Sequence, residues 1–332
     1  MLETGILPRF MKRFSGGFVL AFHEMPAKQL AEFVDSFRPA QAVSLTDLVQ
    51  RNKSGKSTAG LFAITIDDGT AENVRDLARL FLAREWPATF YLPTHYLETG
   101  ESMAFQWWRC LQPHLPRRRL ELPSGLLDLS RSGAVRDLSR KMEILWHSGR
   151  LESYVPQILE LVEIVVNEGA ISRAALQPAR PITWAEVEQL SKTDLIRFES
   201  HGVTHTAMSA LTPEELVCEM QRSRDVVTER SGRPCRHLAY PFGSPLSIGT
   251  LAADIAGRFY DSASTLSLGG VDRANPLLLP RIPLYTDNSI LLARLKILLK
   301  FSPPTAFSRI APRREGAASR PAPSHAGTVE SV

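Results

Sequence analysis

Short apolar runs separated by helical patterns limit the fold of this chain more than any other feature of its sequence. Phe18–Phe22, Leu61–Ile66 and Ala88–Leu92 consist almost entirely of apolar side chains, as is typical of short strands buried on both faces. Between the second and the third run, the apolar residues of Ala71–Arg84 recur at helical spacing until Pro87 ends the pattern. Strands and helices joined by short connections predict an α/β fold with a parallel sheet covered by helices.

The middle of the chain, from about Trp107 to Ile182, has a different pattern. It contains two predicted helices, Ala134–His147 and Glu152–Glu168, and no clear strand. We therefore expect a helical insertion at about 107–182. After it the alternation resumes, with a helix expected at Trp184–Leu190, a strand at Ile196–Glu199, a helix at Pro213–Ser231 and a strand at His237–Tyr240.

The two ends of the chain differ from its centre. We predict an N-terminal segment at 1–17, one domain at 18–301 and a tail at 302–332. The tail is rich in Pro, Ala, Arg, Gly and Ser, a composition that predicts disorder. Apolar residues dominate 290–301, but Arg294, Lys296 and Lys300 interrupt them, so a docked C-terminal helix is expected, with contact to a membrane surface as the alternative.

Composition and charge exclude several classes of protein. The formal net charge of +4 in 332 residues does not call for a nucleic-acid partner. The three cysteines have no CxxC spacing, which argues against a disulfide framework and a cysteine–zinc site. Neither a secretory signal pattern nor an apolar run as long as a membrane span is readable, so we expect a cytoplasmic protein with peripheral membrane association as an alternative. Its oligomeric state is not predicted.

Two acids directly follow one of the predicted strands. Asp67 and Asp68 come after Leu61–Ile66 and precede Gly69. The loops at the carboxyl ends of parallel strands are where α/β folds place their sites, and successive residues point in opposite directions. Two adjacent acids at such a position can therefore perform different tasks. Because Asp-Gly pairs also form ordinary solvated turns, the acids alone do not decide between a site and a turn.

Two histidines follow another predicted strand. His201 and His205, in the segment HGVTH, lie four residues apart, a spacing that would place both imidazoles on one side of a helical turn. Two imidazoles and a carboxylate form a normal zinc ligand set that leaves a position for water. Loop histidines that bond to the backbone are the alternative, but two such signals at strand ends favour a metal site.

Five segments occur in the order found in a known family: TIDDGT (Thr65–Thr70), PATFYL (Pro87–Leu92), ITW (Ile182–Trp184), FESHGVTH (Phe198–His205) and LAYPFG (Leu238–Gly243). They resemble the motifs of carbohydrate esterase family four, the polysaccharide deacetylases, which include the nodulation chitooligosaccharide deacetylase. The resemblance covers roughly residues 18–285. It implies a distorted seven-stranded β/α barrel, here with a helical insertion.

The resemblance also implies roles for individual residues. Asp67 matches the catalytic base, and Asp68, His201 and His205 match the metal ligands. The metal would be zinc, with cobalt or nickel as alternatives. The backbone N–H of Phe242 in the LAYPFG loop would complete the site for the oxyanion of the reaction.

The sequence departs from the family pattern in three respects, one of which is that no DxxW pattern follows the LAYPFG loop. Many members carry an arginine that orients the base, and the matching residue here is Ala239. The late Leu-x-His motif that supplies a general acid is not visible either. His23, which ends the first predicted strand, is the best replacement, since an early histidine fills this role in the related poly-N-acetylglucosamine deacetylases. A structural or capping role for His23 is the alternative.

These features predict a metal-dependent hydrolase that removes acetyl groups from N-acetylated sugars of a polysaccharide or chitooligosaccharide. An O-acetyl esterase or a peptidoglycan deacetylase with the same site is the first alternative. A sugar-binding protein that kept the fold and lost turnover is the second. The intact acid and histidine pairs argue against this second alternative, whereas the missing arginine and late histidine argue for it.

Overall fold

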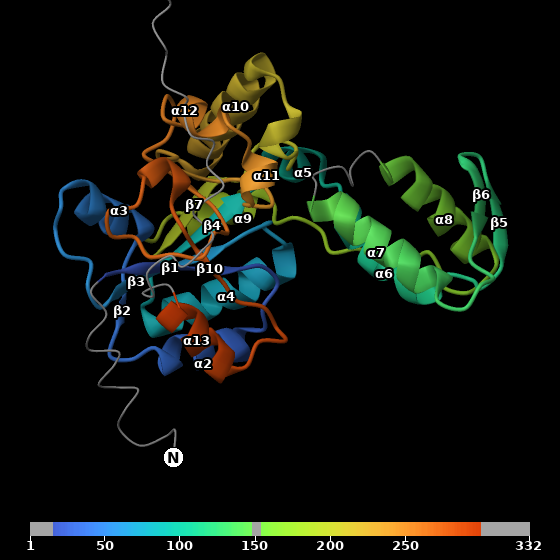
Figure 1. Ribbon diagram of the computed structural model, residues 1–332, viewed down its shortest axis with the longest axis horizontal. Helices are drawn as coiled ribbons and strands as arrows, with labels where there is room; N and C mark the ends of the chain where they lie inside the picture. The colour runs from blue at the N-terminus through green and yellow to red at the C-terminus, as the bar shows by residue number, and fades with distance from the viewer. Residues whose placement is uncertain (1–15, 148–153, 300–332) are drawn as a thin grey trace, which may run out of the picture. The chain divides into compact units, whose positions relative to one another are not determined.

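The computed structural model describes residues 16–147 and 154–299. The predicted disordered tail at 302–332 and nearly all of the predicted N-terminal segment lie outside these ranges. Figure 1 shows the sheet, the helices that pack around it and the helical segment inserted between β4 and β7. Every predicted strand and helix named above is present within the described residues, with ends shifted by a few residues.

A curled parallel sheet forms the centre of the fold, as expected. Seven strands follow one another in the order β10-β1-β3-β4-β7-β8-β9, and β2 pairs with β3 beside this path. Their bounds are β1 Phe18–Phe22, β2 Gln41–Ala42, β3 Leu61–Ile66, β4 Ala88–Leu92, β7 Ile196–Ser200, β8 His237–Ala239, β9 Ser262–Ser264 and β10 Ile282–Pro283. All of these strand pairs are parallel, so the carboxyl ends of neighbouring strands open onto one edge.

Helices pack on the sheet and bury the apolar sides that their sequence periodicity predicts. Their bounds are α2 Ala27–Ser36, α3 Leu45–Lys53, α4 Ala71–Arg84, α5 Thr94–Thr99, α9 Trp184–Leu190, α10 Pro213–Ser231, α11 Pro245–Ile248, α12 Ala252–Ala256 and α13 Ile290–Leu299. Helix α10 begins as its sequence indicates. Thr212 caps it and exchanges hydrogen bonds with Glu215, and Pro213 takes the first helical position.

The segment between β4 and α9 has an apolar core of its own. It consists of α6 Ala104–Leu111, the 3-10 turn Gln112–His114, β5 Arg119–Leu122, β6 Gly125–Asp128, α7 Ala134–His147 and α8 Val155–Asn167. Trp108, Leu120 and Ile158 are among the side chains buried in this second core. The antiparallel pair β5 and β6 corrects the expectation of a segment without strands. Its turn at Pro123 and Ser124 was the available signal, but strands this short leave little periodicity to read.

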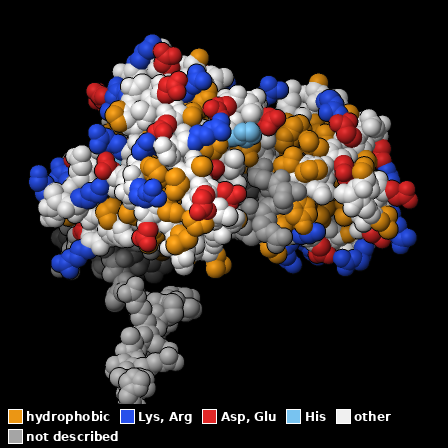
Figure 2. Space-filling model, turned by 90° about the horizontal axis from the view of Figure 1, so that it is seen from above, with side chains coloured by type: hydrophobic (Ala, Val, Ile, Leu, Met, Phe, Trp, Pro, Cys, Tyr) orange, Lys and Arg blue, Asp and Glu red, His pale blue; other side chains and the backbone are white. Residues whose placement is uncertain are grey.

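The C-terminal helix is docked, as predicted. Ala293 and Ile297 of α13 are buried, and the helix packs against α2. Its outer face keeps Leu291 and Leu295 exposed. None of the described helices is long and apolar enough to cross a membrane. Figure 2 shows acidic and basic side chains interspersed over the face that it presents.

Candidate metal centre and active site

The predicted site residues meet at the carboxyl edge of the sheet. Asp67 and Asp68 follow β3, and His201 follows β7. The strand pairing extends one residue beyond each end, because the Asp67 N–H donates to the Phe22 carbonyl over 2.9 Å and the His201 N–H donates to the Leu92 carbonyl over 2.9 Å. The acid pair and His201, far apart in sequence, are thereby held at fixed positions after β3 and β7, two strands that are separated only by β4.

Asp68, His201 and His205 form a compact, buried cluster. The Asp68 Oδ1 atom lies 3.6 Å from the Nε2 atom of His201 and 3.5 Å from that of His205. Two ligand atoms that bind one tetrahedral ion at about 2.1 Å are about 3.4 Å apart, so the spacing fits a single metal ion. Among the described residues Asp68 Oδ1 has no hydrogen-bond partner although it is buried. A buried carboxylate oxygen aimed at two imidazole nitrogens is suited to a divalent cation.

Hydrogen bonding and burial prepare the two histidines as ligands. The Nδ1 atom of His201 donates to the Ala239 carbonyl over 2.8 Å, which leaves the Nε2 lone pair directed at Asp68. Burial, followed by the proximity of His201, lowers the pKa of His205 to about 3. Burial raises the pKa of Asp68, but the adjacent imidazoles of His201, His23 and His205 outweigh burial and hold the pKa well below its usual value. Burial lowers the pKa of His201, but Asp68 and Asp67 outweigh burial and raise it. The Asp68 carboxylate and the neutral His205 imidazole are in the ionisation states that metal binding requires, and His201 would lose its proton when a metal ion binds.

The backbone of the site is strained. Asp68, His205 and Phe242 have φ angles of 74°, 56° and 62°, in the left-handed region that residues other than glycine rarely adopt. Because Gly202 is also left-handed, at 79°, the HGVTH segment forms a loop. The expected helical turn is therefore wrong, although both imidazoles still reach one point. The backbone is bent at each position where a ligand or a pocket-lining residue has to be aimed.

Glu219 of α10 holds the histidine loop in shape. One of its oxygens, Oε1, accepts hydrogen bonds from the N–H groups of Val203 and Thr204 over 2.8 and 2.7 Å, and from the Thr204 hydroxyl over 3.1 Å. No local sequence pattern distinguishes Glu219 from the other acids of the helix. Its role depends on α10 packing beside β7.

Asp67 is fixed by an arginine that comes from the far end of the chain. Arg281 is buried, and its Nη1 and Nη2 atoms bond Oδ1 and Oδ2 of Asp67 over 2.7 and 2.8 Å. Two further N–H groups bond the Thr65 hydroxyl over 3.1 Å and the Thr265 carbonyl over 3.0 Å. Burial raises the pKa of Asp67, but Arg281 and the nearby histidines outweigh burial, so the pKa lies below its usual value. Asp67 is thus an ionised, oriented carboxylate.

Arg281 occupies the role that the sequence analysis found missing at Ala239. The arginine precedes β10, which pairs with β1, whereas Ala239 ends β8. A single cation inside the apolar stretch Leu277–Leu284 was the sequence signal, since a charge is seldom placed among core residues without a partner. The partner itself was not readable, because Arg281 and Asp67 are 214 residues apart.

His23 and Phe242 line the pocket beside the triad, which has a volume of about 480 Å³. The Nε2 atom of His23 lies 3.8 Å from Oδ2 of Asp67, and the His23 side chain is 30% exposed. The Phe242 ring packs edge-on against His205, with ring centroids 4.8 Å apart. The structure therefore brings His23, Asp67, Phe242 and the triad together; the catalytic roles assigned to them remain predictions.

We predict that Glu219→Ala weakens metal binding by about 10–100-fold, because the histidine loop loses the acceptor that shapes it. Glu219→Gln should lose less, since its amide oxygen still accepts from the two N–H groups. Zinc affinity measured by competition with a chelating dye tests this. Glu229→Ala, an exposed acid on the same helix, is the control. Equal affinities in all four proteins would contradict the role.

We predict that Arg281→Met destabilises the chain by about 3–5 kcal/mol, because it leaves the Asp67 carboxylate buried without its partner. Asp67→Asn should also destabilise the chain by stranding the guanidinium. The double variant should be less destabilised than the sum of the two, because both charges are then gone. Urea denaturation of the four proteins measures the coupling. Simple additivity would show that the pair does not act as a unit.

Comparison with known proteins agrees with this site. Residues 146–256 match the family model described as polysaccharide deacetylase. The matched stretch contains His201, His205 and Phe242, whereas Asp67 and Asp68 precede it. Comparison with curated protein sequences found no match.

Several solved structures have a similar fold at low sequence identity. The Streptococcus pyogenes deacetylase PplD, solved in complex with acetate, matches with a TM-score of 0.54 and 14% identity over 87% of this chain and 99% of that chain. IcaB from Ammonifex degensii has a TM-score of 0.55 and 13% identity, covering 85% of this chain and 97% of its own. The BpsB deacetylase domain from Bordetella bronchiseptica has a TM-score of 0.52 and 12% identity over 82% and 97%.

These likenesses in structure concern the fold, and the family model adds the sequence match. The curled parallel sheet carries a buried Asp-His-His triad at its carboxyl edge, where the motifs of the sequence predicted it. The chain thus shares its fold with solved deacetylases, and residues 146–256 match the polysaccharide deacetylase family model.

Proposed function

We propose that this chain is a zinc-dependent N-deacetylase that removes acetyl groups from N-acetylated sugar units of a polysaccharide or chitooligosaccharide. The observation that carries the proposal is the position of Asp67. It is an ionised carboxylate held by Arg281 beside the Asp68–His201–His205 triad, and His23 lies next to it. Metal-dependent amide hydrolysis requires a general base, a set of metal ligands and a proton donor around one pocket.

The donor set favours zinc. One carboxylate and two imidazoles are a common zinc ligand set, and cobalt and nickel accept similar ligands. Held by Asp68, His201 and His205, the cation would supply Lewis acidity that makes water a stronger nucleophile and polarises the acetyl carbonyl. The identity of the metal is part of the proposal.

The residues around the triad carry the proton transfers of the proposed reaction. Asp67 accepts a proton from the attacking water, whose oxygen bonds the carbonyl carbon, and the Phe242 N–H is assigned to the developing oxyanion. His23 donates a proton to the leaving nitrogen as the C–N bond breaks. The products are acetate and a free amine on the sugar. Arg281 keeps Asp67 ionised and oriented, so that its free lone pairs can take the proton.

The arginine weakens the case for a non-catalytic sugar-binding protein. One of the two arguments for that alternative was the missing arginine at Ala239, and Arg281 supplies an equivalent contact from another strand. The second argument was the missing late histidine, and His23 lies at the pocket where a proton donor is needed. A catalytic protein is therefore better supported than a non-catalytic sugar-binding protein.

Acetate release from defined sugars tests the proposed function. We expect the zinc-loaded chain to release acetate from N-acetylglucosamine oligomers and to leave free amines. Asp67→Asn should lose turnover and still bind zinc, because asparagine cannot accept the proton and is not a ligand. Acetate, amine and zinc content are measured together. Release only from O-acetylated sugars would indicate the esterase, and zinc-loaded protein inactive on every acetylated sugar would overturn the proposal.

We predict that His23→Ala lowers the rate by about 10²–10⁴-fold, the usual range for loss of a general acid, with metal affinity little changed. The nitrogen would otherwise leave as an amine anion. An activated ester with a good leaving group should be cleaved almost normally by the variant, because it needs no proton donor. Similar losses on both substrates, or a normal rate on the amide, would remove His23 from this role.

A further inference from the structure

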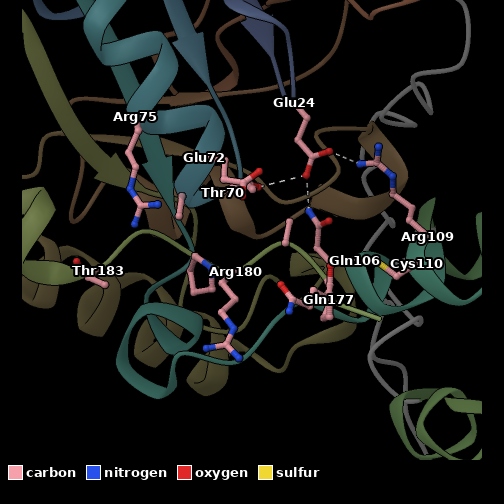
Figure 3. A pocket seen from close by; sticks show the side chains of 14 residues that line it. Glu24, Thr70, Glu72, Arg75, Gln106, Arg109, Cys110, Gln177, Arg180 and Thr183 are labelled. Atoms are coloured by element: carbon pink, nitrogen blue, oxygen red, sulfur yellow. Dashed lines mark hydrogen bonds and ion pairs between the residues drawn. The ribbon is translucent and has the colours of Figure 1, made fainter. Parts of the chain in front are cut away.

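A second cavity, of about 580 Å³, adjoins the pocket of the triad. The start of α4, the segment 177–181 and helix α6 of the inserted segment line it (Figure 3). Glu24 and Arg109 line both cavities, so the two spaces are neighbours that share one wall. The volume is in the range of pockets that bind small ligands.

The shared wall is held by hydrogen bonds on the residue that follows His23. Oε1 of Glu24 accepts from Nε2 of Gln106 over 2.7 Å and from the Thr70 hydroxyl over 3.4 Å. Its Oε2 atom pairs with Nη1 of Arg109 (Figure 3). Both oxygens of Glu24 are therefore engaged, and its charge is already compensated from α6. This arrangement leaves little acidic character for a ligand in the second cavity.

The lining of the second cavity contains more basic than acidic side chains. Arg75, Arg109 and Arg180 line it, against the acids Glu24 and Glu72. Arg75 uses its Nε atom for Glu186, over 2.5 Å, and Arg109 uses Nη1 for Glu24, which leaves further N–H groups on both.

Arg180 is the most available of the three cations. Among the described residues its guanidinium has no ion-pair partner, and its side chain is exposed. Its carbonyl accepts from the Ala71 N–H over 2.8 Å, so the backbone beneath the guanidinium is fixed to the start of α4. A guanidinium on a fixed backbone is suited to bind carboxylate or phosphate through two parallel hydrogen bonds.

We propose that this cavity binds a sugar unit next to the one that is deacetylated, and that Arg180 recognises an anionic group on it, a carboxylate or a phosphate ester. The substrate would then be an acidic glycan in which N-acetylated units alternate with, or adjoin, charged units. The inference rests on the proposed function for the reaction in the first pocket. Binding of the charged unit in the second cavity is a separate property.

Binding probes without acetyl groups test the cavity independently of turnover. A trimer of glucuronic acid, a trimer of glucose with the same linkage and a glucose trimer carrying one phosphate ester are titrated calorimetrically into the zinc-loaded full chain. We expect at least one acidic trimer to bind about tenfold more tightly than the neutral one, and the preference to fall with added salt. The tighter of the two acidic trimers identifies the charged group.

Matched arginine variants assign the preference to this cavity. Arg180→Gln should remove most of the preference, and Arg180→Lys should keep part of it, because lysine retains the charge without the two-pronged geometry. Arg140→Gln, an exposed arginine on α7 outside the cavity, is the control and should keep all of it. Equal binding of acidic and neutral trimers, or equal losses in the Arg180→Gln and Arg140→Gln variants, would overturn the proposal.

Activity distinguishes failure of this inference from failure of the proposed function. Oligomers that alternate N-acetylglucosamine with glucuronic acid are compared with N-acetylglucosamine oligomers of equal length. If carboxylate is the recognised group, Arg180→Gln should raise KM about tenfold for the acidic oligomers only. Acidic binding without acetate release from any glycan would refute the deacetylase and keep the anion site. Acetate release without any preference for acidic oligomers would refute the anion site and keep the deacetylase.

Discussion

Parallel pairing of the central strands is the constraint on which the rest of the structure depends. Because β1, β3 and β7 run in one direction, the residues that follow them reach the same edge of the sheet. His23, the acid pair and the first metal-binding histidine are each the residues directly after a strand. The hydrogen bonds between the strand backbones thus fix where these residues lie, and the loops that follow the strands add the remaining residues of the site.

Nearby groups of opposite charge allow buried carboxylates at this edge to stay ionised. Two adjacent carboxylates would repel each other, and each would be costly to bury alone. Arg281 neutralises Asp67 on one side, and the imidazoles of the triad lie against Asp68 on the other. The two acids are thereby placed in different surroundings, Asp67 against a guanidinium and Asp68 against two imidazoles. Strained φ angles at Asp68 and His205 are the conformational cost of this placement.

The inserted segment contacts the carboxyl edge of the sheet, where the candidate site lies. Helix α6 contributes Gln106 and Arg109 to Glu24, which directly follows His23. A segment with its own apolar core therefore contributes lining residues to both the pocket of the triad and the second cavity. Variation in such a segment would change what lies beside the reaction centre without altering the sheet that carries it.

The sequence by itself determined the alternation of strands and helices, the acid pair, the histidine pair and their places at strand ends. These features depend on local periodicity and on strand direction, which a single sequence displays. Only the tertiary structure decided that Arg281 replaces the arginine absent at Ala239, that Glu219 shapes the histidine loop and that the HGVTH segment is not helical. The physical reason is sequence distance. A buried ion pair between residues 214 positions apart depends on which strands pair, and local sequence patterns do not determine the order of the strands.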